Sequence, residues 1–369
     1  MSKWPQHSLG TVIELAYGKS LPKNKRTDGG NIPVYGSNGI AGWHDESLLD
    51  GPAVIVGRKG SAGAVQFVDG PCYPIDTTYF VRPRDGFDFD IKFLFYMLRH
   101  LDLSRLKTAT GVPGLTREDA YREMISVPPL SEQRRIVDLL SRAEGIVRLR
   151  REAEKKAAKL ILALLLDMFG DPTSNPKGWA LARLGEISTV KGGGTPSKAN
   201  PAYWAGEIPW VSPKDMGGVE RISDAIDHIS QEALSGSATN LIPAGAILVV
   251  TRSGVLKHSL PCAITSRPVA INQDIKAFLP NERVHPNYLL AQLKLRSREI
   301  LGLVRVGATV QNIETDALKR LQIPLPPKSH QVAFSERVEQ IRSIQSQQSA
   351  AAAKAQSTFD ALLARTFNN

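Results

Sequence analysis

Hydrogen-bonding side chains in short glycine-rich segments are the residues of this 369-residue chain whose types and spacing suggest chemistry. Arg, Lys, Asn, Gln, Ser and Thr on exposed loops can pair with the edges of nucleic acid bases, and Lys, Arg and backbone amides can anchor phosphates. In the first half of the chain, residues 35–39 and 58–61 have this character. The candidate contact residues there are Tyr35, Ser37, Asn38, Arg58, Lys59, Ser61, Thr77, Thr78, Lys107 and Thr110.

The second half of the chain offers a comparable set. Its candidate contact residues are Lys191, Lys198, Lys214, Arg252, Ser253, Lys257, Asn272, Gln273, Thr309, Gln311 and Asn312. Any single residue of this kind is more often a solvated surface residue than a contact. Arg58 and Arg252 are the strongest candidates, because each follows an apolar run and we place them at the same position of a repeat. Trp204 and Trp210 are compatible with base contact or with core packing.

Enzyme motifs are weak in this sequence. Residues 200–203, Asn-Pro-Ala-Tyr, resemble the Asn-Pro-Pro-Tyr motif that holds a flipped adenine, but the second proline and a preceding glycine-rich cofactor loop are missing. Residues 274–276 carry the carboxylate–lysine end of a nuclease motif without a convincing partner carboxylate. Residues 57–61 lack the spacing of a P-loop, and the seven histidines show no metal-ligand spacing. We therefore predict no catalytic residue and no metal site.

A long-range repeat must position the candidate residues. Gln133, which follows Pro-Pro-Leu-Ser-Glu, recurs as Gln331 after Pro-Pro-Lys-Ser-His, and residues 164–169 recur as residues 362–367 at the same spacing. Upstream the match continues with small insertions and deletions. The corresponding pairs are residues 9–10 and 184–185, 32–33 and 208–209, 51–56 and 245–250, 71–72 and 261–262, and 110–115 and 307–313. The chain is therefore a tandem duplication of one plan.

Each copy begins with a part rich in Gly, Pro and short apolar runs. Short apolar runs between turn residues predict strands, and apolar residues that recur every three or four positions predict helices. The predicted strands are residues 53–56, 79–81, 247–251 and 275–279, and the predicted helices are residues 91–101 and 287–300. Each first part is thus expected to be a mixed α+β domain.

Each copy ends in a long predicted helix. A proline pair stops the preceding element, and Ser131 and Ser329 are the predicted N-caps. One narrow apolar stripe runs along each helix and is interrupted only at Arg150 and Gln348. The stripe residues are Ile136, Leu139, Ala143, Ile146, Ala153, Ala157, Leu160 and Leu164, and then Ile341, Ile344, Ala351, Ala355 and Leu362. We predict that the helices, about 57 Å long at 1.5 Å per residue, pair as an antiparallel coiled coil. Separate packing of each helix on a globular core is the alternative.

The composition fits a globular protein that meets polyanions. There are 46 Lys and Arg against 36 Asp and Glu, so the net charge is +10 and the sequence pI is about 9.6. The two cysteines, Cys72 and Cys262, are too few for a disulfide scaffold or a structural zinc site. Residues 1–5 do not resemble a signal peptide, and the most apolar run, residues 160–166, is too short to span a bilayer. A reducing cytoplasm without membrane attachment is the expected location.

Two stretches at the junctions between domains and helices carry a family resemblance. They are Gly-Leu-Thr-Arg-Glu-Asp-Ala at residues 114–120 through residues 127–136, and Lys-Gly-Gly-Gly-Thr-Pro-Ser at residues 191–197 through residues 208–211. With them, essentially the whole chain resembles the DNA specificity subunits of type I restriction–modification systems. At the second junction residues 328–331, Lys-Ser-His-Gln, depart from the usual Ser-Glu-Gln type, but the proline pair, the glutamine and the helix remain.

The resemblance implies an α+β fold. Two mixed α/β target-recognition domains would be separated by two long helices that form an antiparallel coiled coil, with a pseudo-twofold internal repeat. The expected parts are a first target-recognition domain at 1–130, a first spacer helix at 131–170, a second target-recognition domain at 171–327 and a second spacer helix at 328–369. Each domain would bind half of a split double-stranded DNA target, and the helices would set the gap. Because the loops at residues 57–63 and 251–257 differ, we expect two unlike half-sites.

The resemblance also implies partners. Two methyltransferase subunits would dock along the helices, and ATP-dependent restriction subunits would bind to those. S-adenosylmethionine, ATP and Mg²⁺ would then belong to the partner subunits, and this chain would hold no cofactor and catalyse no reaction. The alternatives are a specificity subunit of a related system with methylation and cleavage on one partner chain, and a coiled-coil scaffold that binds no DNA.

Overall fold

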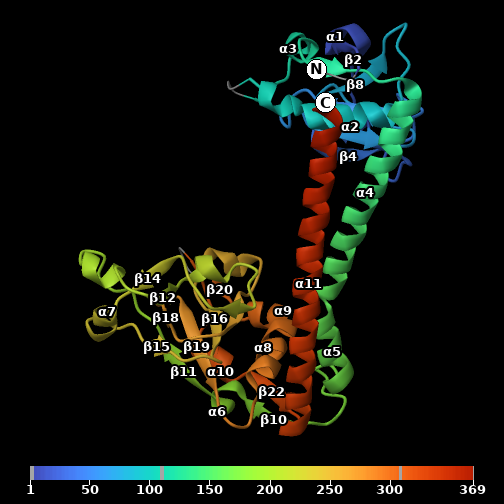
Figure 1. Cartoon of the computed structure of the whole chain (residues 1–369). Helices are drawn as coiled ribbons and strands as arrows, with labels where there is room; N and C mark the ends of the chain where they lie inside the picture. The colour runs from blue at the N-terminus through green and yellow to red at the C-terminus, as the bar shows by residue number, and fades with distance from the viewer. Residues whose placement is uncertain (1–3, 109–111, 307–309, 369) are drawn as a thin grey trace. The chain divides into compact units, whose positions relative to one another are not determined.

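The computed structural model describes residues 4–108, 112–306 and 310–368, and the chain divides into two compact units (Figure 1). Unit 1 consists of Met1–Glu152 and Ser349–Asn369, and unit 2 consists of Ala153–Gln348. Both long helical segments of the sequence are therefore divided between the units. The predicted domain bounds, in which each spacer helix is a part of its own, remain a proposal.

Unit 1 is built on a four-stranded antiparallel sheet in the order β2–β8–β5–β6. These strands are β2 (Ile13–Tyr17), β5 (Ala53–Gly57), β6 (Val65–Val68) and β8 (Thr78–Pro83). Beside it lie the sheets β4–β3–β7 and β1–β9, formed by β1 (Gln6–Ser8), β3 (Ile32–Gly36), β4 (Gly39–His44), β7 (Tyr73–Pro74) and β9 (Met124–Ser126). The helices are α1 (Leu9–Val12), α2 (Ile91–Leu101), α3 (Arg117–Tyr121), α4 (Leu130–Ala157) and the short η1 (Lys23–Lys25) and η2 (Leu103–Leu106).

The core of unit 1 forms where α2 packs against β5 and β6 of the four-stranded sheet, and residues of α4 belong to the same cluster. Every residue of β5 is buried, as expected of an apolar strand with neighbours on both edges. The α2 residues Phe93, Leu94 and Leu98 are fully buried in the same cluster as Leu140 of α4. The Asp90 carboxylate accepts hydrogen bonds from the first turn of α2 and so fixes where this helix begins.

Unit 2 contains a five-stranded sheet in the order β11–β19–β16–β17–β13 and a four-stranded sheet in the order β14–β12–β18–β15. The strands of the first are β11 (Ser188–Gly192), β13 (Arg221–Ile222), β16 (Ile247–Val250), β17 (Cys262–Thr265) and β19 (Ile275–Pro280). Those of the second are β12 (Ile208–Val211), β14 (Asp227–Ile229), β15 (Leu241–Ile242) and β18 (Val269–Ile271). Two small antiparallel pairs complete the unit, β10 (Ala180–Arg183) with β22 (Gln322–Leu325) and β20 (Arg305–Val306) with β21 (Gln311–Asn312).

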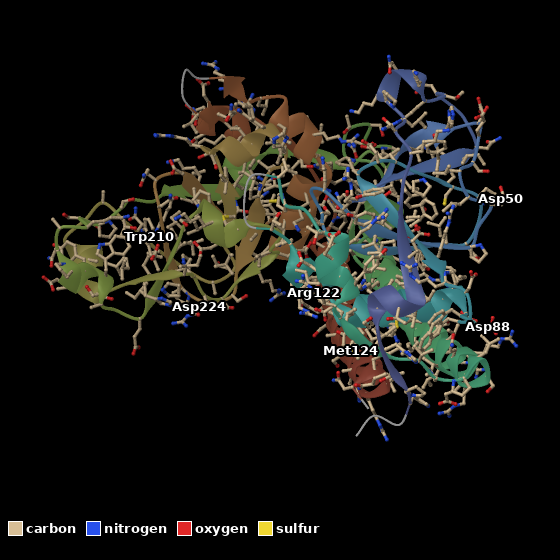
Figure 2. The ribbon with its side chains drawn as sticks, turned by 90° about the horizontal axis from the view of Figure 1, so that it is seen from above. Asp50, Asp88, Arg122, Met124, Trp210 and Asp224 are labelled. Atoms are coloured by element: carbon tan, nitrogen blue, oxygen red, sulfur yellow. The ribbon has the colours of Figure 1, made fainter. Side chains whose placement is uncertain are left out.

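The helices of unit 2 are α5 (Leu160–Phe169), α6 (Leu184–Ile187), α7 (Gln231–Ser235), α8 (Pro286–Leu295), α9 (Ser297–Leu301), α10 (Thr315–Lys319) and the first part of α11 (Lys328–Phe367). The short helices η3 (Pro201–Trp204), η4 (Pro213–Met216) and η5 (Gly254–Lys257) lie in its loops. Phe169 and Phe334 pack together beside the buried Tyr288 of α8, with ring centroids 5.6 Å apart. Trp210, labelled in Figure 2, is buried in a smaller cluster with Ile229 and Ala233.

The four predicted strands and the two predicted shorter helices are confirmed. Residues 91–101 form α2 without a shift, whereas residues 287–300 form two helices, α8 and α9, separated at Arg296. The predicted N-caps are wrong. Both long helices begin two residues earlier than caps at the serines would place them, since the carbonyls of Pro129 and Pro327 accept the first helical hydrogen bonds and the serines lie in the first turn.

The first long helix is interrupted, in contrast to the continuous helix predicted for residues 131–170. Between α4 and α5 the amide of Lys159 donates to the carbonyl of Lys156, three residues earlier. This is the spacing of a 3-10 helix, which is wound more tightly than an α-helix. The Gln345 side chain donates to the carbonyl of Ala157 at 2.7 Å. A side chain that bonds a helix carbonyl at such a break compensates for the lost intrahelical partner. In unit 2, α11 thus runs antiparallel to this segment, because Gln345 meets Ala157 and Phe334 meets Phe169.

Only part of the predicted stripe is buried; at several of its positions the neighbouring residue is buried instead. In unit 1 the buried residues of α4 are Ile136, Leu140 and Val147, whereas Leu139 and Ile146 are exposed. In unit 2, Leu160 and Ile344 are likewise exposed, whereas Ala157, Ile161, Leu165 and Val338 are buried. Adjacent apolar residues create two neighbouring stripes on such a helix, and only contact with the rest of each unit decides which one is covered.

The two units repeat two sets of backbone contacts. The Gln133 amide donates to the carbonyls of Asp88 and Pro128 and accepts from the amide of Asp90. Gln331 donates to Arg283 and Pro326 and accepts from His285 in the same way. We call these two sets of contacts the glutamine anchors. Gly18 and Gly193 are also equivalent, because a Cβ on either would overlap the carbonyl oxygen of Ile75 or Ile271.

The strand register corrects two of the correspondences predicted from the sequence. Val56 pairs with Val65 in unit 1 as Val249 pairs with Cys262 in unit 2, so Cys262 corresponds to Val65. Cys72 instead forms an isolated backbone β-bridge with Leu49. Residues 53–56 therefore correspond to residues 246–249, one position away from the gap-free match. Both cysteines are buried, and burial raises the pKa of each thiol to about 11.

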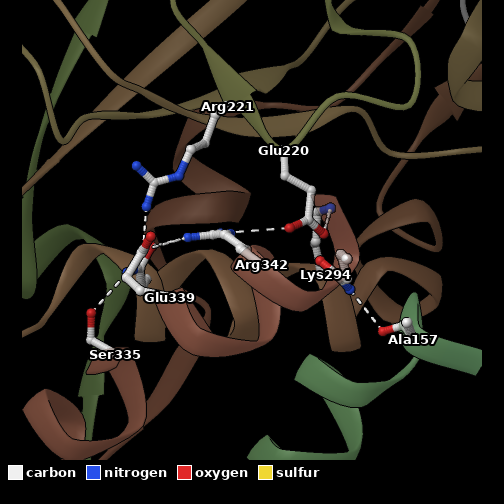
Figure 3. A network of polar contacts seen from close by, with 9 residues as sticks. Ala157, Glu220, Arg221, Lys294, Ser335, Glu339 and Arg342 are labelled. Atoms are coloured by element: carbon white, nitrogen blue, oxygen red, sulfur yellow. Dashed lines mark hydrogen bonds and ion pairs between the residues drawn. The ribbon is translucent and has the colours of Figure 1, made fainter. Parts of the chain in front are cut away.

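Ionic contacts join the helices within each unit. In unit 1, Arg99 of α2 pairs with Glu144 of α4 at 2.9 Å. In unit 2 the contact includes a loop: Glu220 bonds Lys294 of α8 at 2.5 Å and Arg342 of α11 at 3.5 Å (Figure 3). Burial raises the pKa of Glu220, but the two cations more than compensate, and its pKa lies below the usual value.

Candidate nucleic acid interface

The loops at one end of the four-stranded sheet bring together most of the residues predicted in unit 1. The amides of Arg58 and Lys59 both donate to the carbonyl of Thr77, and Lys59 also forms a bridge with Gly114. Asn38 and Ser61 face each other, with a Ser61 Oγ to Asn38 Oδ1 distance of 3.5 Å. Lys59, Ser61 and Asn38 are exposed at this edge. The segments containing Tyr35 to Asn38, Arg58 to Ser61 and Thr77 thus form one surface.

An aromatic ring lies beneath two arginines at this edge. Tyr17, at the end of β2, is 53% exposed, and the Arg117 guanidinium lies 3.9 Å from its ring centroid. Arg58 lies 5.3 Å from the same centroid, and its Nε donates to the carbonyl of Asp76 at 2.9 Å. Below them Tyr79 is buried and donates to the carbonyl of Leu115; burial, with Tyr17 as a neighbour, raises its pKa to about 12. We call Tyr17, Arg58 and Arg117 the arginine platform.

Two predicted contact residues in unit 1 support the loops from inside. Ser37 is buried, and its hydroxyl lies at hydrogen-bond distance from the carbonyls of Lys59 and Thr77. Thr78 is fully buried and donates to the carbonyl of Ile75 at 2.7 Å. Neither side chain presents its polar atom to solvent, so their role is corrected from contact to loop support. Lys107 is exposed and lines a cavity of about 480 Å³ with Gly60, Ser61 and Arg99, while Thr110 lies outside the described residues.

The corresponding edge of unit 2 has the same backbone and different side chains. The amides of Thr251 and Arg252 donate to the carbonyl of Asp274, and Arg252 forms a bridge with Asn312. The exposed Arg252 guanidinium lies 3.6 Å from the Asp274 carboxylate. The amide of Ser253 donates to the carbonyl of Gln311, which joins the loop to β21. Arg252, Ser253, Gln311 and Asn312 therefore form one surface.

The remaining predicted residues of unit 2 differ in where they lie. Gln273 is exposed in the loop that contains Asp274, and its Oε1 accepts a hydrogen bond from the Thr195 hydroxyl at 2.5 Å. Lys191 is exposed on β11. Asn272 is buried and bonded to Asp274, so it supports the loop. Lys257 is exposed on η5, which contacts β21. The contacts of the described residues do not join the exposed Lys198 and Lys214 to this surface; Lys198 lies near Trp204 instead. Thr309 lies outside the described residues.

The two arginines chosen from the sequence do not occupy the same position. The carbonyl of Arg58 accepts from Leu115, and in unit 2 the carbonyl of Thr251 accepts from Ile313. The residue equivalent to Arg58 is therefore Thr251, and the residue equivalent to Arg252 is Lys59. The prediction of equivalent loops is confirmed, but the residues are shifted by one, because the gap-free match of the preceding strands was one position out.

Sequence reasoning missed two members of the arginine platform. Tyr17 ends a strand that was not predicted, so nothing indicated that its ring would be exposed at the loop edge. Arg117 belongs to the junction sequence at residues 114–120, which carries the family resemblance and contains no predicted contact residue. The signal for Arg117 was available, since it follows a segment already chosen for contacts.

The weak enzyme motifs have structural explanations. Asn200 caps η3, its side chain accepting from the amide of Ala202, which is a local turn contact. Asp274 is engaged by Arg252 and Asn272. Within residues 4–108, 112–306 and 310–368 no cluster of His, Cys, Asp and Glu suits a metal ion. In the same ranges, no helix has the length and apolarity to cross a membrane.

Comparison with known proteins gives the family directly. The sequence matches the family described as the type I restriction modification DNA specificity domain over residues 1–159 and 176–352, one match in each half of the chain. It is 41% identical over 145 residues to the EcoR124I/EcoR124II specificity subunit of Escherichia coli, covering 39% of this chain. It is 31% identical over 159 residues to the MjaIX specificity subunit of Methanocaldococcus jannaschii, covering 42% of this chain. The matches span 36% of the length of each of these relatives.

Solved structures share the fold. The S subunit of a type I restriction–modification system from M. genitalium aligns with a TM-score of 0.60 at 15% identity, over 99% of this chain and 96% of that one. A chain from work on complex assembly and conformational transition of the type I R-M system aligns with a TM-score of 0.62 at 21% identity, over 98% and 96%. At these identities the likeness concerns the fold.

Proposed function

The chain belongs to the type I restriction–modification DNA specificity family, and from this premise we propose that it binds a bipartite, asymmetric DNA target. As a specificity subunit it is not itself an enzyme. Unit 1 binds one half-site and unit 2 binds the other. One observation carries this proposal: the same backbone frame presents a cationic loop in both units, at Lys59 and at Arg252, with different neighbours.

Charge supports a nucleic acid ligand. Among the described residues Arg58, Lys59 and Arg117 have no carboxylate within ion-pair distance, so all three are available to phosphates or base edges. The exposed side-chain amides of unit 2, on Gln273 and Asn312, suit base edges. Because the two sets differ in chemistry, the two half-sites differ in sequence.

The long helical segments would supply the gap and the docking surface. We propose that they pair as an antiparallel coiled coil with a pseudo-twofold relation between the two halves, so that their length sets the distance between half-sites. Methyltransferase subunits, two per chain, bind along them, and restriction subunits bind to those. S-adenosylmethionine, ATP and Mg²⁺ act in the partner subunits, and this chain needs no cofactor. Such a complex works in the cytoplasm.

The experiment is to co-express the full chain with a cognate methyltransferase subunit and to map modified adenines across the host genome. We expect a split motif of two unlike halves with a fixed gap, absent without this chain. Arg252→Ala should relax one half only, and Lys59→Ala the other. Equal relaxation of both halves by either variant would contradict separate recognition. Insertion of one helical turn into both long helices should change the gap, and an unchanged gap would exclude the ruler.

Two other functions give different outcomes. A coiled-coil scaffold that binds no DNA would show no salt-dependent DNA affinity, whereas a phosphate-binding protein loses affinity steeply as salt rises. A specificity subunit of a related system would give the same split motif but would copurify with one chain that both methylates and cleaves.

A further inference from the structure

We propose that Arg117 determines specificity in unit 1 by recognising a guanine of the first half-site, and that Tyr17 positions it. The inference rests on the proposed DNA-binding function. It concerns a residue outside the loops that the sequence indicated. It also predicts a base, not only a surface.

The geometry fixes Arg117 without using its hydrogen-bond donors. Its guanidinium lies over the Tyr17 ring at 3.9 Å and 5.6 Å from the ring of Tyr79. Its Nε is buried and has no hydrogen-bond partner, and among the described residues no ion pair or hydrogen bond occupies the guanidinium. A guanidinium held by stacking keeps its planar set of N–H donors oriented and loses little side-chain entropy when a partner arrives.

The surroundings direct this donor set to the proposed interface. Arg117 begins α3, two residues after Leu115, whose amide donates to the carbonyl of Arg58 in the contact loop. Tyr17 is 53% exposed, so the stack of its ring with Arg117 lies at the surface of the unit. Arg58, by contrast, has its Nε bonded to the carbonyl of Asp76, which leaves Arg117 as the member of the arginine platform without a polar partner.

The chemistry favours guanine. An arginine that approaches a base edge with two parallel N–H donors matches the O6 and N7 acceptors of guanine, which is the commonest specific contact of arginine in the major groove. Unit 2 has no counterpart. The strand pairing puts Gly192 at the position of Tyr17 and Lys276 at that of Tyr79, and Thr315 corresponds to Arg117. The half-site of unit 2 should therefore lack this contact.

The test uses the full chain in complex with its methyltransferase partner and a duplex DNA library in which the first half-site is randomised. The wild-type complex should select one guanine strongly. Arg117→Ala should lower selection at that single position by about ten- to a hundredfold. Arg117→Gln should shift the preference there toward adenine, because Gln pairs with the N6 and N7 of adenine. Tyr17→Ala should relax the same position, and Tyr17→Phe, which keeps the ring, should not.

Arg122→Ala is the matched control. Arg122, labelled in Figure 2, directly follows the same short helix and carries the same charge. Its exposed side chain pairs with Asp119 at 3.6 Å. It should leave the selected motif unchanged. A uniform loss of affinity with Arg117→Ala, or relaxation at a base other than guanine, would overturn the inference while leaving the proposed function intact. A wild-type complex without any sequence preference would overturn both. Complex formation by each variant shows that it is folded.

Discussion

The contact between α2 and α4 in unit 1 and the equivalent contact between α8 and α11 in unit 2 carry different charges. Glu144 follows Gln133 at the distance at which Arg342 follows Gln331, and Arg99 follows Asp90 as Lys294 follows His285. In unit 1 this places a cation against an anion, Arg99 against Glu144. In unit 2 it places two cations together, Lys294 and Arg342, and Glu220 lies between them (Figure 3).

A duplicated contact can thus change its chemistry and keep its geometry. Glu220 directly precedes β13, the fifth strand of the sheet in unit 2, and the four-stranded sheet of unit 1 has no such strand. The extra segment thus supplies the anion that the spacer helix provides in unit 1. The ring of contacts extends further, because Arg342 also bonds Glu339 at 2.8 Å and Asn287 at 2.9 Å. Unit 2 therefore joins a loop, α8 and α11 where unit 1 joins two helices.

The largest expected effect removes what the units share. Gln133→Leu and Gln331→Leu each delete a glutamine anchor, leaving a backbone amide and two carbonyls without partners at a buried position. We expect a loss of about 3 kcal/mol in the free energy of unfolding for each variant. Amide hydrogen exchange should show the loss at α2 for the first and at α8 for the second. A loss of amide protection in the other unit instead would contradict the expectation that each anchor stabilises only its own unit.

Arg342→Glu gives unit 2 the helix charge of unit 1 and should have the next largest effect. The new carboxylate would face Glu220 and Glu339, and Arg342 is only 15% exposed, so screening by water is limited. We expect about 2 kcal/mol of destabilisation, measured by thermal and denaturant unfolding. Adding Glu220→Gln should recover part of this loss, since Lys294 would then pair with the new carboxylate as Arg99 does with Glu144. An additive double variant would argue against the bridging role of Glu220.

Glu144→Arg makes the reverse exchange in unit 1 and should cost less. Arg99 and Glu144 are each 37% exposed, and surface pairs of this kind contribute little. Tyr96 would also lose the Glu144 carboxylate as its acceptor. We expect about 1 kcal/mol of destabilisation, smaller at high salt than at low salt. Glu144→Gln is the control that removes the charge without reversing it. An effect as large as that of Arg342→Glu would show that burial does not distinguish the two contacts.

The smallest effect is a pH dependence confined to unit 2. The pKa of Glu220 is raised by burial and lowered further by Lys294 and Arg342, with a net position below its usual value of 4.5. A carboxyl with a depressed pKa stabilises the folded state above its usual pKa, and the contribution is lost as the pH falls through the depressed value. Glu220→Gln should therefore lower the Tm at pH 7 and approach the wild type in acid. A Tm difference that is the same at pH 7 and pH 3 would contradict this assignment.

Sequence patterns predicted the helices and strands well. They predicted less well which residues of an element are buried and which residues of the two units correspond. Residues 91–101 and 53–56 stand out because a helical period and a short apolar run are local signals. Which of Leu139 and Leu140 is buried depends on contacts with α2 and with the end of α11, and periodicity does not contain that information. The one-residue shift between Arg58 and Arg252 has the same origin, since apolar runs of Val, Ile and Leu align equally well in two registers.

The candidate surface was predicted in outline for a related reason. Loops rich in Gly, Lys and Ser mark an exposed edge, which located Lys59, Ser61 and Arg252. Burial depends on the packing of distant segments, so Ser37, Thr78 and Asn272 were indistinguishable from their exposed neighbours. The arginine platform requires the end of β2 to meet the start of α3, which lie far apart in the sequence.

The glutamine anchors fix the rotation of each long helix about its own axis as well as the residue at which it begins. Gln133 ties the first turn of α4 to the cap of α2, so Leu140 and Val147 face the core of unit 1 at one angle about the helix axis. One inserted residue would lengthen the helix by only about 1.5 Å but turn everything beyond it by about 100°. A seven-residue insertion completes nearly two turns and restores the angle to within about 20°. The length of the helix can therefore change only by insertions that leave the residues beyond them at nearly the same angle about the helix axis.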